Sequence, residues 1–152
     1  MLDDDEVRRF TRLPVPMPDD FPEQWLERYE EGRRDGTREI FAIVDADEGR
    51  FLGVALAANI DRDAATVELG YVVDRRARGR GVAREALAAL TQWAFDELHV
   101  ERIELMISAE NEPSKRVAAR CGYVYEGTLR SNHLKAGIRE DAELWSKLPS
   151  DP

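Results

Sequence analysis

The sequence changes from a strand pattern to a helix pattern at Arg75-Arg76-Ala77-Arg78-Gly79-Arg80-Gly81-Val82-Ala83. Residues typical of a strand, Thr66 to Val73, precede this corner, and a long amphipathic helix pattern follows it. At such a corner the first N–H groups of the helix lack partners, and the helix dipole favours an anion. The four arginines and two glycines therefore predict a phosphate-binding site, against the alternative of a flexible, solvated basic loop.

The two glycines of the corner have a specific use. Without a side chain, Gly79 and Gly81 let the backbone approach a diphosphate and adopt positive φ without strain. The neighbouring arginines would add charge-assisted hydrogen bonds. The corner is not a P-loop, because the Gly-Lys-Ser/Thr ending is absent, and Arg84 stands where a dinucleotide-binding motif has its third glycine. The corner alone thus predicts a phosphate ligand without identifying it.

Length and charge set the class of protein. The chain has 152 residues and a formal net charge of −9, and its length predicts one domain, residues 1–152. The acidity disfavours nucleic acid as a partner; it either favours cationic partners such as amines or serves only solubility. No apolar run approaches the roughly 20 residues of a membrane helix, the first residues are acidic, unlike a secretory signal, and the single Cys121 excludes an internal disulfide. We therefore expect a cytoplasmic protein that binds no membrane.

The predicted elements run in the order helix, three strands, helix, strand, helix and two strands. The predicted helices are 21–34, 83–98 and 113–120, and the predicted strands are 37–46, 51–60, 66–73, 103–108, 123–134 and 138–148. Several prolines predict an extended segment before the first helix. The helix 83–98 crosses between two parallel strands, which indicates an α+β domain with a mixed sheet. A phosphate site is expected at the carboxyl end of the strand before that helix.

Several motifs carry a resemblance to a known family. Arg76-x-x-Gly79-x-Gly81, between a strand and a helix, resembles the acetyl-CoA motif of the GNAT N-acetyltransferases. The run Asn111-x-x-Ser114-x-x-Val117-Ala118-x-x-x-Gly122-Tyr123-x-x-Glu126-Gly127 resembles the ribosomal-protein-alanine N-acetyltransferase branch of that superfamily. Leu129-Arg130, Gly137-x-x-x-Asp141 and Leu144-Trp145-Ser146 extend the resemblance. It covers roughly Val7 to Leu148, with the motifs in the family's order and spacing.

The resemblance implies a fold and a co-substrate. The fold is a mixed, mostly antiparallel sheet with helices on both faces, in which a bulge in the strand 66–73 splays the central parallel pair around the cofactor. The co-substrate is acetyl-CoA, and no metal is implied. Asn111 would bond the pantetheine amide, or cap the helix after it, or do both. The cofactor-binding residues implied are Tyr71, Val72, Val73, Arg76, Arg78, Gly79, Arg80, Gly81, Val82, Ala83, Asn111 and Ser114.

The resemblance also implies two catalytic residues. Glu68 would act as a weak general base through water, and the alternative is a solvated strand carboxylate. Ser114 would donate a proton to the departing thiolate, and the alternative is an ordinary serine in the first turn of a helix. Glu126 is a second candidate for the base. A weak base suffices for an α-amino group, whose pKa near 8 leaves a useful neutral fraction at pH 7.

The implied function is an acetyl-CoA-dependent N-acetyltransferase that acetylates a primary amine by direct attack, most simply a protein N-terminal α-amino group. The alternatives are a small-amine acetyltransferase, for a polyamine or an amino sugar, and a non-catalytic acyl-CoA-binding module. Two departures from the family leave these open: the chain begins after the family's first strand and helix, and Ala118 stands where many members carry a tyrosine acid. A monomer or a homodimer is expected.

Overall fold

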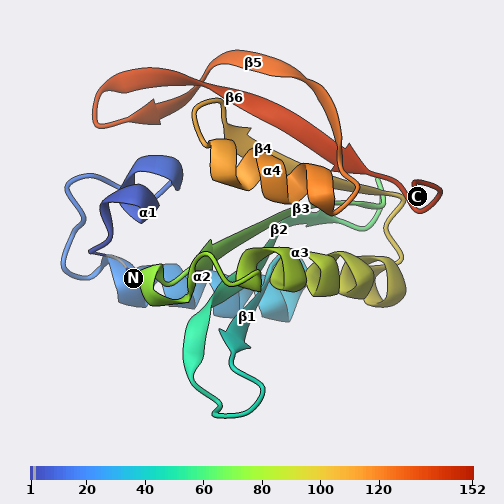
Figure 1. Cartoon of the computed structure of the whole chain (residues 1–152), viewed down its shortest axis with the longest axis horizontal. Coiled ribbons are helices and arrows are strands. Elements are labelled where there is room, and N and C mark those ends of the chain that lie inside the picture. Colours follow the sequence, from blue (N-terminus) through green and yellow to red (C-terminus); the bar gives the residue numbers. More distant parts are fainter. Residues whose placement is uncertain (2) are drawn as a thin grey trace.

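The computed structural model describes Met1 and residues 3–152 (Figure 1). Its helices are α1 (Asp5–Phe10), α2 (Phe21–Asp35), α3 (Val82–Trp93) and α4 (Glu112–Arg120), with a 3₁₀ turn at Arg75–Ala77 and a π-helical turn at Ala94–Leu98. Its strands are β1 (Glu39–Val44), β2 (Phe51–Asp61), β3 (Thr66–Val73), β4 (Arg102–Ser108), β5 (Val124–Lys135) and β6 (Ile138–Lys147). The predicted order of elements is confirmed from α2 onward.

Within the described residues, six strands form one sheet in the order β1-β2-β3-β4-β6-β5. Neighbouring strands are antiparallel except β3 and β4, which are parallel and connected through α3. In Figure 1, α3 and α4 lie in front of the sheet, and the fainter α2 lies behind it. The predicted α+β class and the helices on both faces are therefore confirmed.

The two parallel strands separate soon after they meet. They pair from Thr66 with Arg102 to Glu68 with Glu104, and no later residue of either described strand continues the ladder. The predicted splay is thus present. Its predicted cause is wrong, because β3 keeps an unbroken register with β2 from Glu68 to Val73. The register shift lies instead on β2, between Ala58 and Asp61.

Packing of α3 fixes the crossover between the parallel strands. Leu87 and Ile103 are fully buried, and Leu90 and Val67 join them in the core between helix and sheet. Burial of side chains of this size stabilises the fold by about 2 kcal/mol each. The position of the corner that precedes α3 therefore follows from the core of the domain.

Two local predictions need correction. The first is the extended entry segment, which is preceded by a six-residue helix, α1, that propensity did not indicate. Asp4 caps α1 by accepting a bond from the N–H of Glu6, and ion pairs from Arg78 and Arg9 hold α1 against the rest of the chain. Tertiary contacts therefore stabilise a helix too short to form alone. The second is the helix 83–98, which keeps α-helical geometry only to Trp93 before the π-helical turn.

Candidate active site

A cleft of ≈ 1280 Å³ passes through the opening between β3 and β4. Residues from both faces of β3 line it, together with the carboxyl-terminal half of β4. We call its two ends the corner end, formed by Arg78–Ala83 and the facing side of α4, and the α2 end, formed by Arg12, Tyr29, Arg38, Asn59 and Glu68. A cleft that crosses the sheet can receive two ligands from opposite faces.

The backbone of the corner end is open to a ligand. Gly79 has φ +73° with no atom within 4 Å of a Cβ built there, and Gly81 has φ +84° with only a side-chain oxygen of Glu85 at 3.8 Å. The first helical bond of α3 runs from the N–H of Glu85 to the carbonyl of Gly81, at 3.1 Å. Among the described residues, the N–H groups of Gly79, Gly81, Val82 and Ala83 have no acceptor. These free amides at a helix N-terminus form a cradle suited to an anion.

The arginine side chains of the corner do not all face the cleft. Arg78 lines it, but its guanidinium binds Asp4 at 2.8 Å, Glu6 at 2.6 Å and the carbonyl of Val73 at 3.2 Å. Arg78 therefore joins α1 to the corner. Arg76, whose side chain is 95% exposed, and Arg80 lie outside the lining of the cleft. The prediction that the side chains of Arg76 and Arg80 face a phosphate site is not what the structure shows.

Three other arginines supply positive charge at the corner end. Arg84 on α3 and Arg116 and Arg120 on α4 line the cleft. None of the three has a carboxylate partner among the described residues. The four-residue spacing of Arg116 and Arg120 on one helix face is the sequence signal for this role, and both stand at positions that the family motif leaves unspecified.

The end of β3 offers its backbone to the same cleft. Tyr71, Val72 and Val73 line the cleft, and the edge of β3 that faces β4 has no strand partner at these residues. Unpaired peptide groups on a strand edge can bond an extended ligand. The three residues therefore lie where an extended ligand could contact them, and their binding of the cofactor stays a prediction.

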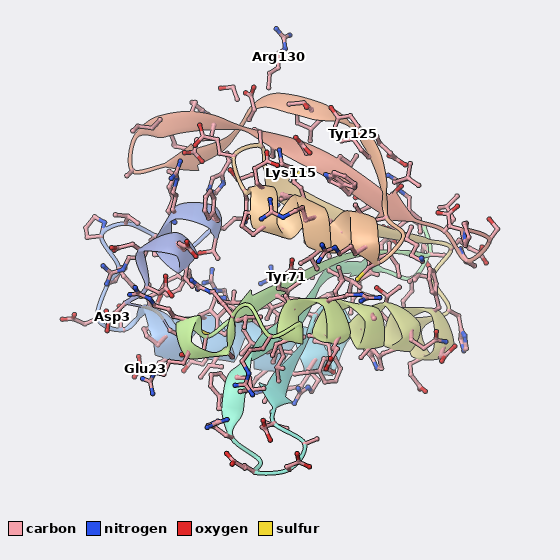
Figure 2. All side chains as sticks on the ribbon, viewed as in Figure 1. Asp3, Glu23, Tyr71, Lys115, Tyr125 and Arg130 are labelled. Atoms are coloured by element: carbon pink, nitrogen blue, oxygen red, sulfur yellow. The ribbon has the colours of Figure 1, made fainter. Side chains whose placement is uncertain are left out.

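Tyr71 also contributes its side chain. Its hydroxyl lies 2.9 Å from Oγ of Ser114, and Figure 2 places Tyr71 between α3 and α4. Burial raises the pKa of Tyr71, and the hydrogen bond from Ser114 only partly opposes this. The hydroxyl therefore stays protonated near neutral pH, and the pair can pass a proton toward the cleft. The sequence predicted only a backbone role for Tyr71.

Asn111 and Ser114 meet at the start of α4. The side-chain oxygen of Asn111 accepts the N–H of Ser114 at 3.2 Å, so the predicted N-cap is present. The side-chain NH₂ of Asn111 has no acceptor among the described residues, and Asn111 is one of the residues that line the cleft. One amide can therefore cap the helix and still donate to a ligand.

Glu68 lies at the α2 end, on the opposite face of β3 from Tyr71. Its two carboxylate oxygens are held by separate partners: Arg12 forms an ion pair at 3.0 Å, and Nδ2 of Asn59 donates a bond at 2.9 Å. The side chain is 22% exposed and lines the cleft. Neither partner was predicted: Arg12 comes from a segment far from Glu68 in the sequence, and Asn59 lies on the neighbouring strand β2, whose register with β3 the sequence did not specify.

Glu126, the second candidate for the base, lies outside the cleft. Arg102 binds both of its carboxylate oxygens, at 2.8 and 2.7 Å, and Ser146 donates a bond at 2.5 Å. Hydrogen bonds from Arg102 and then Ser146 lower the pKa of Glu126 to about 2. A carboxylate so stabilised is a poor proton acceptor, and Glu126 is not suited to be the base.

The charge of the cleft is opposite to that of the chain. Among the described residues, its charged lining consists of two glutamates, Glu6 and Glu68, and seven arginines, namely Arg12, Arg28, Arg38, Arg78, Arg84, Arg116 and Arg120. The chain as a whole carries −9. The net acidity therefore does not describe the surface that a ligand meets, and the expectation that it favours cationic partners does not extend to the cleft.

Comparison with known protein families identifies the family of this chain. A family model described as an acetyltransferase (GNAT) domain matches residues 1–124. The chain belongs to the GNAT family. The predicted recognition and the enzyme class, an N-acetyltransferase, are thereby confirmed at the level of the family. Members of the family use acetyl-CoA, so the predicted co-substrate is confirmed at the same level.

Named relatives of this GNAT domain differ in substrate. It is 33% identical over 112 residues to the probable N-acetyltransferase YjcK of Bacillus subtilis, which covers 73% of the chain and 62% of that protein. It is 31% identical to the L-amino acid N-acetyltransferase AaaT of Escherichia coli (90% of the chain, 81% of that protein). It is 30% identical to the ribosomal protein uS5-alanine N-acetyltransferase of E. coli (91% and 75%), consistent with the predicted branch.

The fold of the GNAT domain also has solved counterparts. A spermidine N-acetyltransferase from Vibrio cholerae, crystallised with CoA and spermine, matches with a TM-score of 0.77 at 23% identity, over 84% of this chain and 75% of that one. At this identity the likeness concerns the fold alone. Among the described residues, no group of three or more His, Cys, Asp or Glu could hold a metal, and no helix has the length and apolar character to cross a bilayer.

Proposed function

We propose that residues 1–152 form a single domain that transfers the acetyl group of acetyl-CoA to an α-amino group, at the N-terminus of a protein, by direct attack. The observation that carries the proposal is the cleft through the sheet, with free amides at the corner end and a carboxylate at the α2 end. We further propose that the enzyme acts in the cytoplasm as a monomer or a homodimer.

The corner end fits the phosphates of coenzyme A. Gly79 and Gly81 leave open a cradle that a Cβ would enter, and their amides and those of Val82 and Ala83 need acceptors. Arg84, Arg116 and Arg120 supply the matching charge. The pantetheine arm would follow the unpaired edge of β3, with Asn111 donating to one of its amides.

The chemistry requires one bond to form and one to break. Acetyl-CoA supplies a thioester: the amine nitrogen bonds to its carbonyl carbon, the carbon–sulfur bond breaks, nitrogen loses a proton and sulfur gains one. Free N–H groups on the edge of β3 would stabilise the negative charge that develops on the carbonyl oxygen, an effect worth about 3 kcal/mol per donor. Ser114, hydrogen-bonded to Tyr71, would supply the proton to sulfur.

Glu68 would receive the proton of the amine through water. Arg12 and Asn59 fix its carboxylate on the face from which the acceptor enters, which is the positioning that a general base needs. The α-amino group suits this arrangement because a useful fraction of it is already neutral at pH 7. The similarity to a ribosomal protein uS5-alanine N-acetyltransferase supports a protein acceptor.

The test is acetyl transfer by the purified protein. Acetyl-CoA is incubated with peptides that differ in their first residue, with free amino acids and with spermidine, and thiol release and the mass of each acceptor are followed. Transfer to α-amino groups is expected. Binding of CoA in calorimetry without turnover on any acceptor would favour the non-catalytic acyl-CoA-binding module. Preference for the terminal primary amines of spermidine would favour the small-amine enzyme.

A further inference from the structure

One face of α2 is directed at the cleft. Phe21, Trp25, Arg28 and Tyr29 line the cleft, at spacings that place them on one side of a helix. The rings of Trp25 and Tyr29 are in contact, with centroids 4.8 Å apart, and the guanidinium of Arg28 lies 5.5 Å from the centre of Phe21. The face is therefore a packed, mainly aromatic wall that carries one positive charge.

A second guanidinium lies beside this wall and belongs to Arg38, the residue that precedes β1. The stem of Arg38 crosses α2 at Gly32, where a Cβ would lie 2.5 Å from the Cβ of Arg38. The guanidinium then lies 5.8 Å from the centre of the Tyr29 ring. Gly32 is buried, and its carbonyl accepts the N–H of Arg38 at 3.2 Å. Because Gly32 has no side chain, the stem of Arg38 can pass close to α2, and its guanidinium then lies beside Tyr29.

Neither of these guanidinium groups has a carboxylate partner. Among the described residues, no carboxylate oxygen lies within 4.0 Å of Arg28 or Arg38, and neither side chain donates a hydrogen bond. Neighbouring arginines do have partners: Arg33 binds Glu39 and Arg34 approaches Glu30 at 3.9 Å. In a chain with 31 acidic residues, Arg28 and Arg38 thus remain available to an anionic ligand in the cleft.

Tyr29 joins these charges to the reacting end of the cleft. It is 7% exposed, and its hydroxyl has no hydrogen-bond partner among the described residues. Burial raises its pKa. Arg12, Arg28, Arg38 and Glu68 line the same cleft as Tyr29, and the guanidinium of Arg38 lies over its ring. The hydroxyl therefore remains a donor, within the field of two unpaired cations and close to the proposed base.

We propose that Arg28, Arg38 and Tyr29 bind a carboxylate that the acceptor carries close to its α-amino group. This inference rests on the proposed function. With the carboxylate held on the wall of α2, the amine is directed to Glu68 and the opening between the strands. Two sources share this chemistry: the α-carboxylate of a free amino acid, and an acidic side chain next to the N-terminus of a peptide. A polyamine has only positive charge to offer and is disfavoured.

The acceptor test uses pairs that differ only in the carboxylate. L-Alanine is compared with L-alaninamide, and a peptide beginning Ala-Asp with one beginning Ala-Asn, with spermidine as the cationic acceptor. We expect kcat/KM to be at least about tenfold higher for the charged member of one or both pairs, through KM, since a charge-assisted bond is lost in the other member. The pair with the larger ratio identifies the source. The same kcat/KM for the charged and the uncharged member within both pairs, or a preference for spermidine, would overturn the proposal.

Single substitutions test whether Arg28 and Arg38 cause the preference for a charged acceptor. Arg38→Gln and Arg28→Gln should each raise KM for the charged acceptor about tenfold, with kcat and the KM of the uncharged acceptor little changed. Arg34→Gln, on the exposed side of the same helix, is the matched control and should change neither. Gly32→Ala should reproduce the loss of Arg38→Gln without altering the guanidinium, because the added Cβ displaces the stem. Parallel losses for charged and uncharged acceptors would contradict a carboxylate site.

A binding measurement separates this inference from the proposed function. If no acceptor is turned over, the proposed function fails, and the carboxylate site is then judged by calorimetry with N-acetyl-alanine and N-acetyl-alaninamide in the presence of CoA. Tighter binding of N-acetyl-alanine that is lost in Arg38→Gln supports the site. Equal binding of the two compounds rejects it.

Discussion

The two ends of the cleft are built from different parts of the protein. The corner end consists mainly of backbone from one continuous segment, Arg78–Ala83, held by the packing of α3. The α2 end consists of side chains from four separate segments that meet only in the folded chain: Arg12, Tyr29, Arg38, and Asn59 with Glu68. The comparison suggests that the corner end serves what the whole family shares, and the α2 end what distinguishes its members.

The largest expected effect is at the corner end. Replacing Gly81 by valine puts a branched side chain at φ +84°, which costs about 1–2 kcal/mol, and blocks the approach of a phosphate to the free amides. We expect the affinity for CoA in calorimetry to fall more than about a hundredfold. The matched control is Gly49→Val, in the β1–β2 turn, where φ is +65° and nothing lies within 4 Å. Unchanged binding in Gly81→Val would refute the phosphate assignment.

The next effect belongs to the α2 end. Glu68→Gln removes the proposed base and should lower kcat about a hundredfold while CoA affinity stays the same. Glu104→Gln is the control, because Glu104 is paired with Glu68 in the parallel ladder but does not line the cleft. Steady-state kinetics and calorimetry measure the two quantities. Equal losses in the two variants would mean that Glu68 acts through the structure of the sheet.

A smaller effect is expected for the hydrogen-bonded pair Tyr71 and Ser114. Tyr71→Phe and Ser114→Ala should each lower kcat roughly tenfold, since they share one hydrogen bond of 2.9 Å. Because the two hydroxyls act together, the double variant should lose little more than either single one. The measurement is a double-mutant cycle on kcat. Fully additive losses would show that the two hydroxyls act independently.

The arginines of the corner end should contribute less than its amides. Arg120→Gln should weaken CoA binding several-fold and reduce its dependence on salt, because this side chain is exposed and its charge is screened. Arg76→Gln should have the weaker effect of the two, since Arg76 does not line the cleft. Calorimetry at two salt concentrations ranks them. A larger loss of CoA affinity in Arg76→Gln than in Arg120→Gln would support the phosphate-binding role that the sequence motif implies for Arg76.

The smallest effect lies away from both ends and concerns stability. The pKa of Glu126 is lowered in the fold to about 2, so its contribution to stability is complete above the ordinary glutamate value and is lost as pH falls toward 2. Glu126→Gln should therefore lower the free energy of unfolding at pH 7, by about 1 kcal/mol or less because the pair is solvent-screened. It should also flatten the change in stability between pH 5 and pH 3 in urea titrations. An equal loss of stability between pH 5 and pH 3 in the wild-type protein and in Glu126→Gln would contradict a stabilising ion pair.

The same contrast explains what could be predicted from the sequence. The strands, the crossover helix and the Gly79–Gly81 cradle depend on local patterns of apolar residues and glycines, so their positions were predictable. The pairing of Tyr71 with Ser114 was only partly accessible, because alternation along a strand gives the face of a side chain but not its partner. The bonds of Glu68 to Arg12 and Asn59 had no local signal at all.

Charge shows the same limit. A net charge of −9 is a property of the composition, whereas the positive lining of the cleft depends on which side chains the fold leaves unpaired. Arg76 and Arg78 look alike in the sequence, yet one is solvent-exposed and the other anchors α1. Only the three-dimensional arrangement distinguishes them.

Strand β3 serves both substrates because Glu68 and Tyr71 are an odd number of positions apart. Inserting or deleting one residue between them would turn one side chain to the wrong face and leave both proposed proton-transfer groups on the same side of the sheet. A change in the length of this stretch therefore displaces one of the two groups even when every remaining residue keeps its identity. The number of residues between Glu68 and Tyr71 is therefore as important for the proposed reaction as the chemical identity of the two side chains.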